Sequence, residues 1–301
     1  MNAVWEWLID PWRLEFMRRA LIVGIGSGIV CGVVGTFVVL RGMAFIGDAV
    51  AHAVFPGVGV GFVLGLNLAL SGAIAGLITA VLVSSMSQQR RLKEDTVIGI
   101  VFAAAFGAGI VLISTQASYT GDLASFLFGQ ILGISDSDVR TVIVVGAAVV
   151  LTTLLFRKEL VAVSLDRETA AAAGVPVARL DTLLYVLVTI AIVISLQAVG
   201  NILVLALLVT PAAAARFLTD RLGPMMIIAA AIGSTGSTVG LYLSFNYNLA
   251  SGGLIVLVLT AMFLIAAIAG PRHGWIAQHR QRTNTHAVNG RDRRRNTATA
   301  P

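Results

Sequence analysis

Long apolar runs are the feature that most constrains how this chain can fold. The chain is 57% hydrophobic and only 12% charged, whereas soluble domains carry about 25% charged residues. Continuous apolar runs of this kind are typical of transmembrane helices, while a β-barrel would show short alternating segments, which are absent. The sequence therefore predicts an all-α, polytopic helical membrane protein embedded in a lipid bilayer.

The apolar runs predict about nine spans. They cover residues 20–40, 47–65, 67–86, 97–115, 141–156, 182–199, 201–219, 223–245 and 253–269. An eight-span arrangement, with two runs merged or one lying in the interface, is also open. Residues 1–17 are tryptophan-rich and predict an interfacial segment. Residues 18–270 form the transmembrane domain, 116–138 include a short amphipathic helix, and 271–301 form a basic tail expected to be disordered.

The distribution of lysine and arginine predicts the orientation. With the C-terminus in the cytoplasm, 17 of the 21 basic residues lie on the inner side and 4 on the outer side. Positive residues favour cytoplasmic loops, so we expect an outer N-terminus and a cytoplasmic C-terminus. The net charge of +6 is explained by these loops and the tail, without nucleic-acid binding.

Two ionisable residues lie within the second apolar run. Asp48 and His52 are four positions apart, so on a helix they share one face. Pro56 has no N–H, so the usual helical donor to the His52 carbonyl is missing. Carboxylate, imidazole and carbonyl groups are ligands for a borderline divalent metal. The alternative is an Asp–His pair that only joins two helices, and spacing alone leaves both open.

Other residues limit the class of protein. His273, His279 and His286 lie in the tail, so no second membrane histidine supports an intramembrane metalloprotease. The sequence has no G-x-x-x-x-G-K-[ST] motif, so ATP binding by a P-loop is excluded. Cys31 is expected to be a core residue. Glycines repeat every fourth residue at 24, 28 and 32 and at 57, 61 and 65, which favours helix packing.

A short polar helix is expected at residues 164–174, on the inner side by the charge count. Ser164 or Asp166 can cap its first turn. The alanines that follow favour helix, and Gly174 with Pro176 ends it. This helix is too short to span a bilayer.

Several motifs in one order resemble the membrane subunits of manganese/zinc ABC importers, the ABC-3 family. They are Leu40-Arg41-Gly42-Met43, Gly47-Asp48-Ala49, His52-Ala53, Pro56-Gly57, Phe128-Gly129, Ala198-Val199-Gly200 and Pro211-Ala-Ala-Ala-Ala215. Ala250 departs from the family pattern, which usually has Pro before the Ser251-Gly252 position. The resemblance covers about residues 18–270.

The resemblance implies a type II ABC importer-like permease in a bacterial cell membrane. It implies a homodimer, two cytoplasmic ATP-binding subunits and an extracytoplasmic metal-binding protein. Asp48 and His52 would bind the transported ion, with no permanently bound cofactor. Mn²⁺ is the first choice of substrate, Zn²⁺ the second and iron the third; an ATP-independent metal/proton exchanger is a further alternative. The short helix would contact the ATPase, through the segment that contains Ser164, Asp166, Glu168, Ala172 and Gly174.

Overall fold

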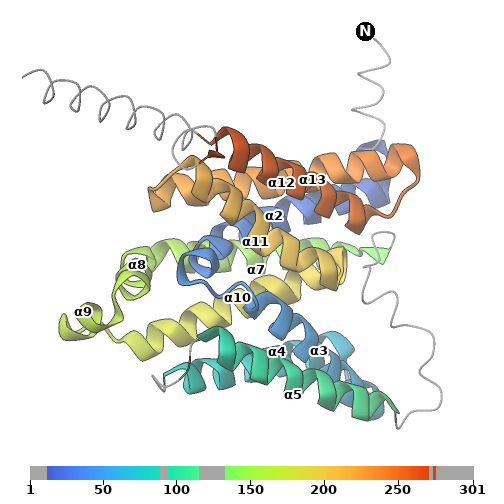
Figure 1. Cartoon of the computed structure of the whole chain (residues 1–301). Coiled ribbons are helices and arrows are strands. Elements are labelled where there is room, and N and C mark those ends of the chain that lie inside the picture. Colours follow the sequence, from blue (N-terminus) through green and yellow to red (C-terminus); the bar gives the residue numbers. More distant parts are fainter. Residues whose placement is uncertain (1–11, 89–91, 93, 115–132, 271–273, 276–301) are drawn as a thin grey trace, which may run out of the picture.

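The computed structural model describes residues 12–88, 92, 94–114, 133–270, 274 and 275 (Figure 1). This described part of the chain consists of helices and connections, without a strand. The sequence prediction of an all-α fold is therefore confirmed. Most of the expected amphipathic helix at 116–138, nearly all of the tail and residues 1–11 lie outside the described residues.

Each expected span overlaps a helix. The long helices are α2 (Glu15–Arg41), α3 (Ile46–Val63), α4 (Leu68–Ser87), α5 (Glu94–Ser114), α7 (Asp136–Leu155), α10 (Val177–Val199), α11 (Asn201–Leu218), α12 (Leu222–Tyr247) and α13 (Ser251–Ala269). Among the described residues, six of them, α2, α4, α7, α10, α12 and α13, are long and apolar enough to cross a membrane. Two further apolar helices, α3 and α11, are shorter by the same measure. The protein is thus a multi-pass helical membrane protein.

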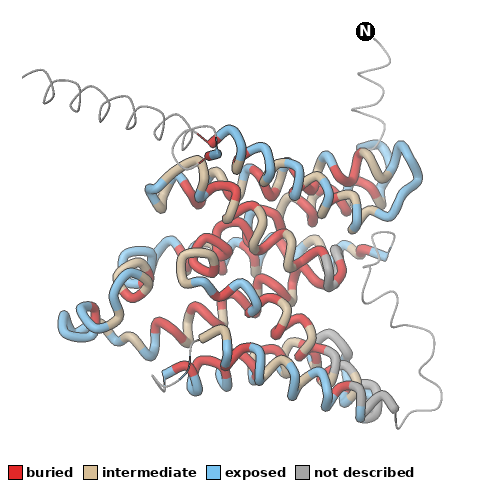
Figure 2. Tube along the Cα trace, in the orientation of Figure 1, coloured by how far each residue is buried: buried red, intermediate tan, exposed pale blue. Residues whose placement is uncertain are grey.

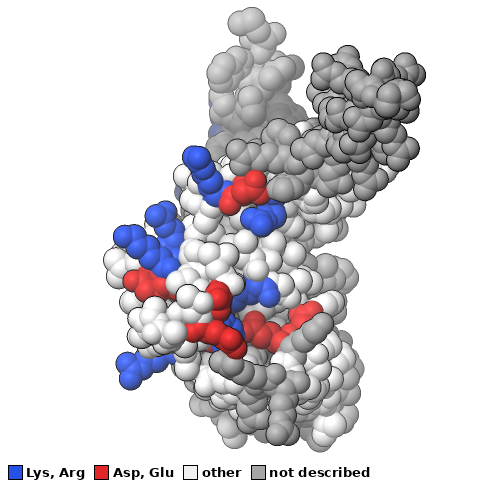
Figure 3. Space-filling model, turned by 60° about the vertical axis from the view of Figure 1, so that its left-hand side comes forward, with Lys and Arg blue, Asp and Glu red and all other residues white. Residues whose placement is uncertain are grey.

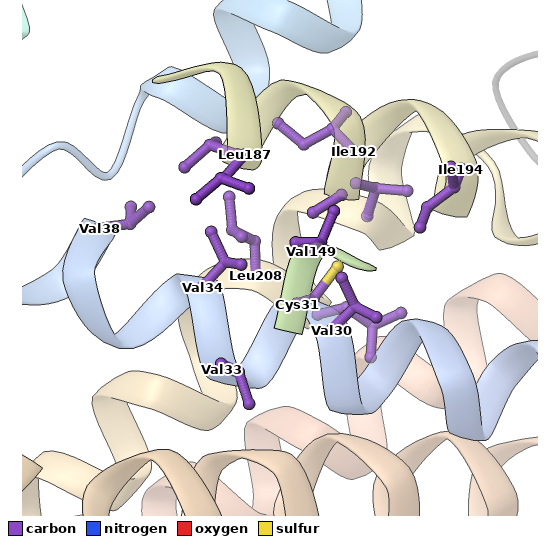
Figure 4. Close-up of a cluster of buried hydrophobic side chains, with 14 of the residues drawn as sticks. Val30, Cys31, Val33, Val34, Val38, Val149, Leu187, Ile192, Ile194 and Leu208 are labelled. Carbon is purple, nitrogen blue, oxygen red and sulfur yellow. The ribbon is translucent and has the colours of Figure 1, made fainter. Parts of the chain in front are cut away.

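The helices form three neighbouring groups. Figure 1 shows α3, α4 and α5 together on one side, α12 and α13 on the opposite side, and α2, α7, α10 and α11 between them. Helix α2 is buried along most of its length, as the red tube in Figure 2 shows. A cluster of aliphatic side chains from α2, α7, α10 and α11 fills the centre (Figure 4). Cys31 lies in this cluster, fully buried, as expected for a core residue.

Glycines allow the closest helix crossings. A Cβ built on Gly28 would lie 2.5 Å from the backbone of Gly233, and a Cβ on Gly233 would meet Gly28 at the same distance. Gly57 similarly lies against Ala75 of α4. The packing role predicted for Gly28 and Gly57 is confirmed, because only glycine permits such close approach of the helices. It is wrong for Gly65, which has φ +66° beyond the end of α3, with open space around its Cα.

The two ends of the bundle carry separate polar contacts. At one end, Arg19 of α2 pairs with Asp136 of α7 at 2.9 Å. At the other end, Arg41 of α2 pairs with Asp181 of α10 at 2.6 Å. The prediction of an amphipathic helix over 116–138 was wrong at its end. Asp136 and Asp138 instead lie in the first turn of α7, where Ser135 and Asp138 form a capping box.

Candidate metal site

Helix α3 places the ionisable pair close to the end of α2. Gly42 ends α2 with φ +70°, a left-handed conformation that suits glycine. Only residues 42–45 separate α2 from α3, and Asp48 lies in the first turn of α3. A carboxylate is favourable there because the N-terminal end of a helix carries partial positive charge.

Asp48 and His52 approach each other as their spacing predicts. The His52 Nε2 atom lies 3.4 Å from Asp48 Oδ1. The side chain of His52 is 20% exposed and that of Asp48 is 37% exposed. Both therefore remain within reach of an ion that enters the bundle. Pro56 lies inside α3, as expected.

Two aromatic residues of α5 hold the imidazole. The His52 ring lies edge-on to Phe102 and Phe106, with centroid distances of 5.2 and 5.1 Å. The two phenyl rings are nearly parallel, 6.0 Å apart. Sequence reasoning did not single out these residues. Their only signal was the four-residue spacing that puts two aromatic rings on one face of the fourth span.

One chain supplies too few ligands for a closed metal site. Within the described ranges, no group of three or more His, Cys, Asp and Glu side chains lies close enough to hold a metal ion. Zinc sites normally use three or four protein ligands. If the Asp48–His52 pair binds a metal, it would therefore need further ligands to enclose the ion.

The short polar helix expected at 164–174 is present, but it begins at Arg167 rather than near Ser164. The structure has two short helices, α8 (Arg157–Leu165) and α9 (Arg167–Ala172), which break at Asp166. Asp166 caps α9 by accepting hydrogen bonds from the backbone N–H groups of Glu168 and Thr169. Ser164 is not the cap, because its hydroxyl donates to Leu160 O within α8 at 2.6 Å.

The end of α9 follows the prediction. Gly174 has φ +81° and its N–H donates to Ala171 O, while the Val175 N–H donates to Ala170 O. These two bonds form a Schellman motif, which closes a helix at a left-handed glycine. Ala172 is exposed in the last turn. The helix is thus closed at both ends and presents a small surface to solvent.

The Asp166 carboxyl group has a perturbed acidity. Its hydrogen bonds, chiefly the one from the Thr169 hydroxyl and then those from the Thr169 and Glu168 N–H groups, lower the pKa of Asp166 below its ordinary value. Each of these donors favours the charged carboxylate. Asp166 is therefore an anionic cap at neutral pH.

Fold and site together define a multi-pass membrane protein with an Asp–His pair inside its helical bundle and a short, capped helix at one end. A family model described as the ABC 3 transport family matches residues 13–270. The chain belongs to this family.

Relatives with described roles cover most of the chain. The manganese transport system membrane protein MntC of Listeria monocytogenes is 43% identical over 87% of this chain and 93% of its own length. The chelated iron transport system membrane protein YfeC of Yersinia pestis is 37% identical over 90% and 92%, respectively. Among solved structures, PsaBC from Streptococcus pneumoniae in complex with Fab superposes with a TM-score of 0.80 and 38% identity, covering 92% of this chain and 99% of that one.

Proposed function

We propose that this chain is the permease subunit of an ATP-driven importer of Mn²⁺. The observation that carries the proposal is the Asp48–His52 pair, which places an anionic oxygen and an imidazole nitrogen side by side in a chain 43% identical to a manganese transport membrane protein. Ionisable side chains at membrane depth are costly and are usually kept for ion pathways. The chain is a transport subunit rather than an enzyme, and family membership favours an ABC importer over an exchanger.

Two copies of the chain complete the site. A two-fold homodimer that brings α3 of each copy to its axis supplies two carboxylates and two imidazoles. The carboxylates offset the charge of the ion and the neutral imidazoles donate nitrogen lone pairs. Such a shared site can open when the two copies move apart, which suits a transported ion that must bind and then leave.

The remaining partners follow from what this chain lacks. Because its sequence has no P-loop, ATP hydrolysis belongs to two cytoplasmic ATP-binding subunits, and an extracytoplasmic metal-binding protein delivers the ion. Helix α9 is the contact to the ATPase. Three features of α9 support this role: both of its ends are closed, its surface is exposed, and it lies away from the end of the bundle that carries Arg19 and Asp136.

The membrane arrangement has nine spans with a cytoplasmic C-terminus. Two observations support it. Each long helix coincides with an apolar run, and Arg41 and Arg167, both placed inside by the charge count, meet the same carboxylate at one end of the bundle. Arg19, placed outside by that count, lies at the other end.

Manganese is favoured over zinc and iron by the donor set and the relatives. Mn²⁺ accepts mixed oxygen and nitrogen ligands, and no thiolate lies beside the pair in the described residues. A bare Asp/His site would nevertheless bind Zn²⁺ more tightly than Mn²⁺. Selectivity therefore has to come from site geometry, metal supply and the binding protein. Zinc stays the second choice and iron the third, and the relative YfeC supports iron as an alternative.

The test is uptake by the complete transporter in proteoliposomes. With the metal-binding protein outside and ATP supplied to the ATPase, we expect manganese uptake that exceeds zinc and iron uptake and that stops without ATP. Zinc uptake alone would replace manganese as the substrate. Uptake of no divalent metal would overturn the proposed function.

A further inference from the structure

Four charged side chains and one serine join five helices at the end of the bundle that carries α8 and α9. Figure 3, which brings this side forward, shows Lys, Arg, Asp and Glu side chains interspersed there. The members that touch one another are Arg41 at the end of α2, Glu94 at the start of α5, Ser164 in α8, Arg167 in α9 and Asp181 in α10. We name this group the arginine cluster.

Asp181 is the centre of the arginine cluster. Its Oδ1 accepts from Arg41 Nη1 at 2.6 Å and its Oδ2 accepts from Arg167 Nη2 at 2.5 Å. The side chains of Asp181 and Arg41 are only 2% and 4% exposed. A buried carboxylate is tolerated when it is paired and hydrogen-bonded, and removing a partner leaves an uncompensated charge. These contacts therefore hold three helix ends in a fixed relation.

Arg167 bridges two carboxylates with one side chain. Its Nη1 donates to Glu94 Oε1 and its Nη2 to Asp181 Oδ2, each at 2.5 Å. The planar guanidinium suits this arrangement because its donors are fixed in a fork. Of the six residues of α9, all of which are described, Ala170 alone is buried. The ion pairs of Arg167 therefore act beside the packing of Ala170 in fixing the position of α9.

The arginine cluster is connected along the chain to α3 and α5, the two helices that form the His52 site. Arg41 is the last residue of α2, seven residues before Asp48 and joined to α3 by residues 42–45. Glu94 is the first residue of α5, eight residues before Phe102, or about 12 Å along a helix. The ligand-bearing helix and the helix that holds the imidazole are thus tied to α9 through the same side chains.

We infer that Arg167 and Asp181 are positioning residues that transmit movement of α9 to the metal site. Rigid helices joined by ion pairs move together, so a displacement of α9 shifts the ends of α2 and α5 at once. The consequence is a displacement of the Asp48–His52 pair and of the phenyl rings of α5. This inference rests on the proposed function, since it assigns a route between the ATPase contact and the ion.

The decisive variant is Arg167→Lys in the complete transporter. Lysine keeps the positive charge but cannot bridge Glu94 and Asp181 with a planar fork. We expect normal recovery of the complex and roughly a tenfold rise in ATP hydrolysed per metal ion imported, which corresponds to about 1.4 kcal/mol. Arg179→Lys is the matched control, because Arg179 is an exposed arginine on α10.

A second variant tests the α5 branch alone. Glu94→Gln keeps the shape of the side chain and removes its charge, and it is expected to raise the same ratio while leaving Asp181 paired. It also decides the question if Arg167→Lys does not assemble. The inference is overturned if an assembled variant hydrolyses ATP per imported metal ion at a ratio within twofold of the Arg179→Lys control. Metal uptake by the wild-type transporter would still uphold the proposed function in that case. Absence of uptake by the wild type would overturn both.

Discussion

The imidazole of His52 lies edge-on against the ring of Phe106, with centroids 5.1 Å apart. Phe102 lies against the same imidazole at 5.2 Å. Neither phenyl ring can ligate a metal, yet together they limit how the imidazole can turn. Helix α5 therefore limits the direction in which the nitrogen lone pairs of His52 can point.

Replacing Phe106 with leucine should lower metal uptake. An edge-to-face aromatic pair contributes about 0.5–1.5 kcal/mol, so the loss of a fixed imidazole orientation should reduce the initial uptake rate up to roughly tenfold. Uptake and complex yield would be measured in proteoliposomes. Phe263→Leu is the control, because it removes a similar edge-to-face pair with Phe217 between α13 and α11. Equal uptake by the two variants would show that α5 does not orient His52.

Substitution of the pair itself separates a metal site from a structural contact. Asp48→Ala and His52→Ala should each abolish or strongly reduce uptake and leave dimer assembly and ATPase binding intact. If the pair only joined the helices, both variants would misassemble and Asp48→Asn would retain most transport. Near-normal uptake by His52→Ala would end the metal-site hypothesis.

The crossing of α2 and α12 should be intolerant of any side chain. Gly233→Ala would place a Cβ against the backbone of Gly28, and such overpacking costs typically about 1–3 kcal/mol. We expect a lower midpoint of thermal unfolding in detergent. Gly253→Ala is the control, since its Cβ would meet open space in α13. A midpoint for Gly233→Ala equal to that of the control would contradict the close crossing.

The cap of α9 should depend on pH in a defined direction. The pKa of Asp166 is lower in the folded chain than in an unfolded one, so its stabilisation is complete above the ordinary carboxyl pKa of about 3.9. It is lost as the pH falls through the lower, folded value. Hydrogen exchange over residues 167–172, corrected for the intrinsic rate, should show less protection at acidic pH.

The matched variant for this measurement is Asp166→Asn. Asparagine accepts the same backbone hydrogen bonds without titrating, so its protection should not change with acidification. If protection fell equally in the wild type and in Asp166→Asn, the acid effect would lie elsewhere than in the cap.

Local patterns in the sequence predicted the features that depend on neighbouring residues. The four-residue spacing brought Asp48 and His52 together, and Gly174 ended α9, because helix geometry alone determines both. The choice between Ser164 and Asp166 as the cap was not determined by the sequence, since both residues have suitable side chains. The structure resolves it because Arg41 donates to Ser164 Oγ at 3.0 Å and Ser164 remains inside α8.

Contacts between distant segments could not be predicted in the same way. Asp181 directly precedes the span expected at 182–199, and nothing in its neighbours showed that it would meet Arg41, 140 residues earlier. Phe102 and Phe106 were likewise indistinguishable from lipid-facing residues. Such contacts depend on which helices pack together, and a glycine repeat indicates close packing without identifying the partner helix.

The contact between Gly28 and Gly233 has a consequence for how the cell makes this protein. Helix α2 leaves the ribosome about two hundred residues before its partner α12, an interval of roughly 10–40 s at ordinary rates of synthesis. Throughout that time the glycine-lined face of α2 has to be covered by lipid or by the insertion machinery. The central helix α2 therefore acquires this neighbour only long after α2 itself has been synthesised.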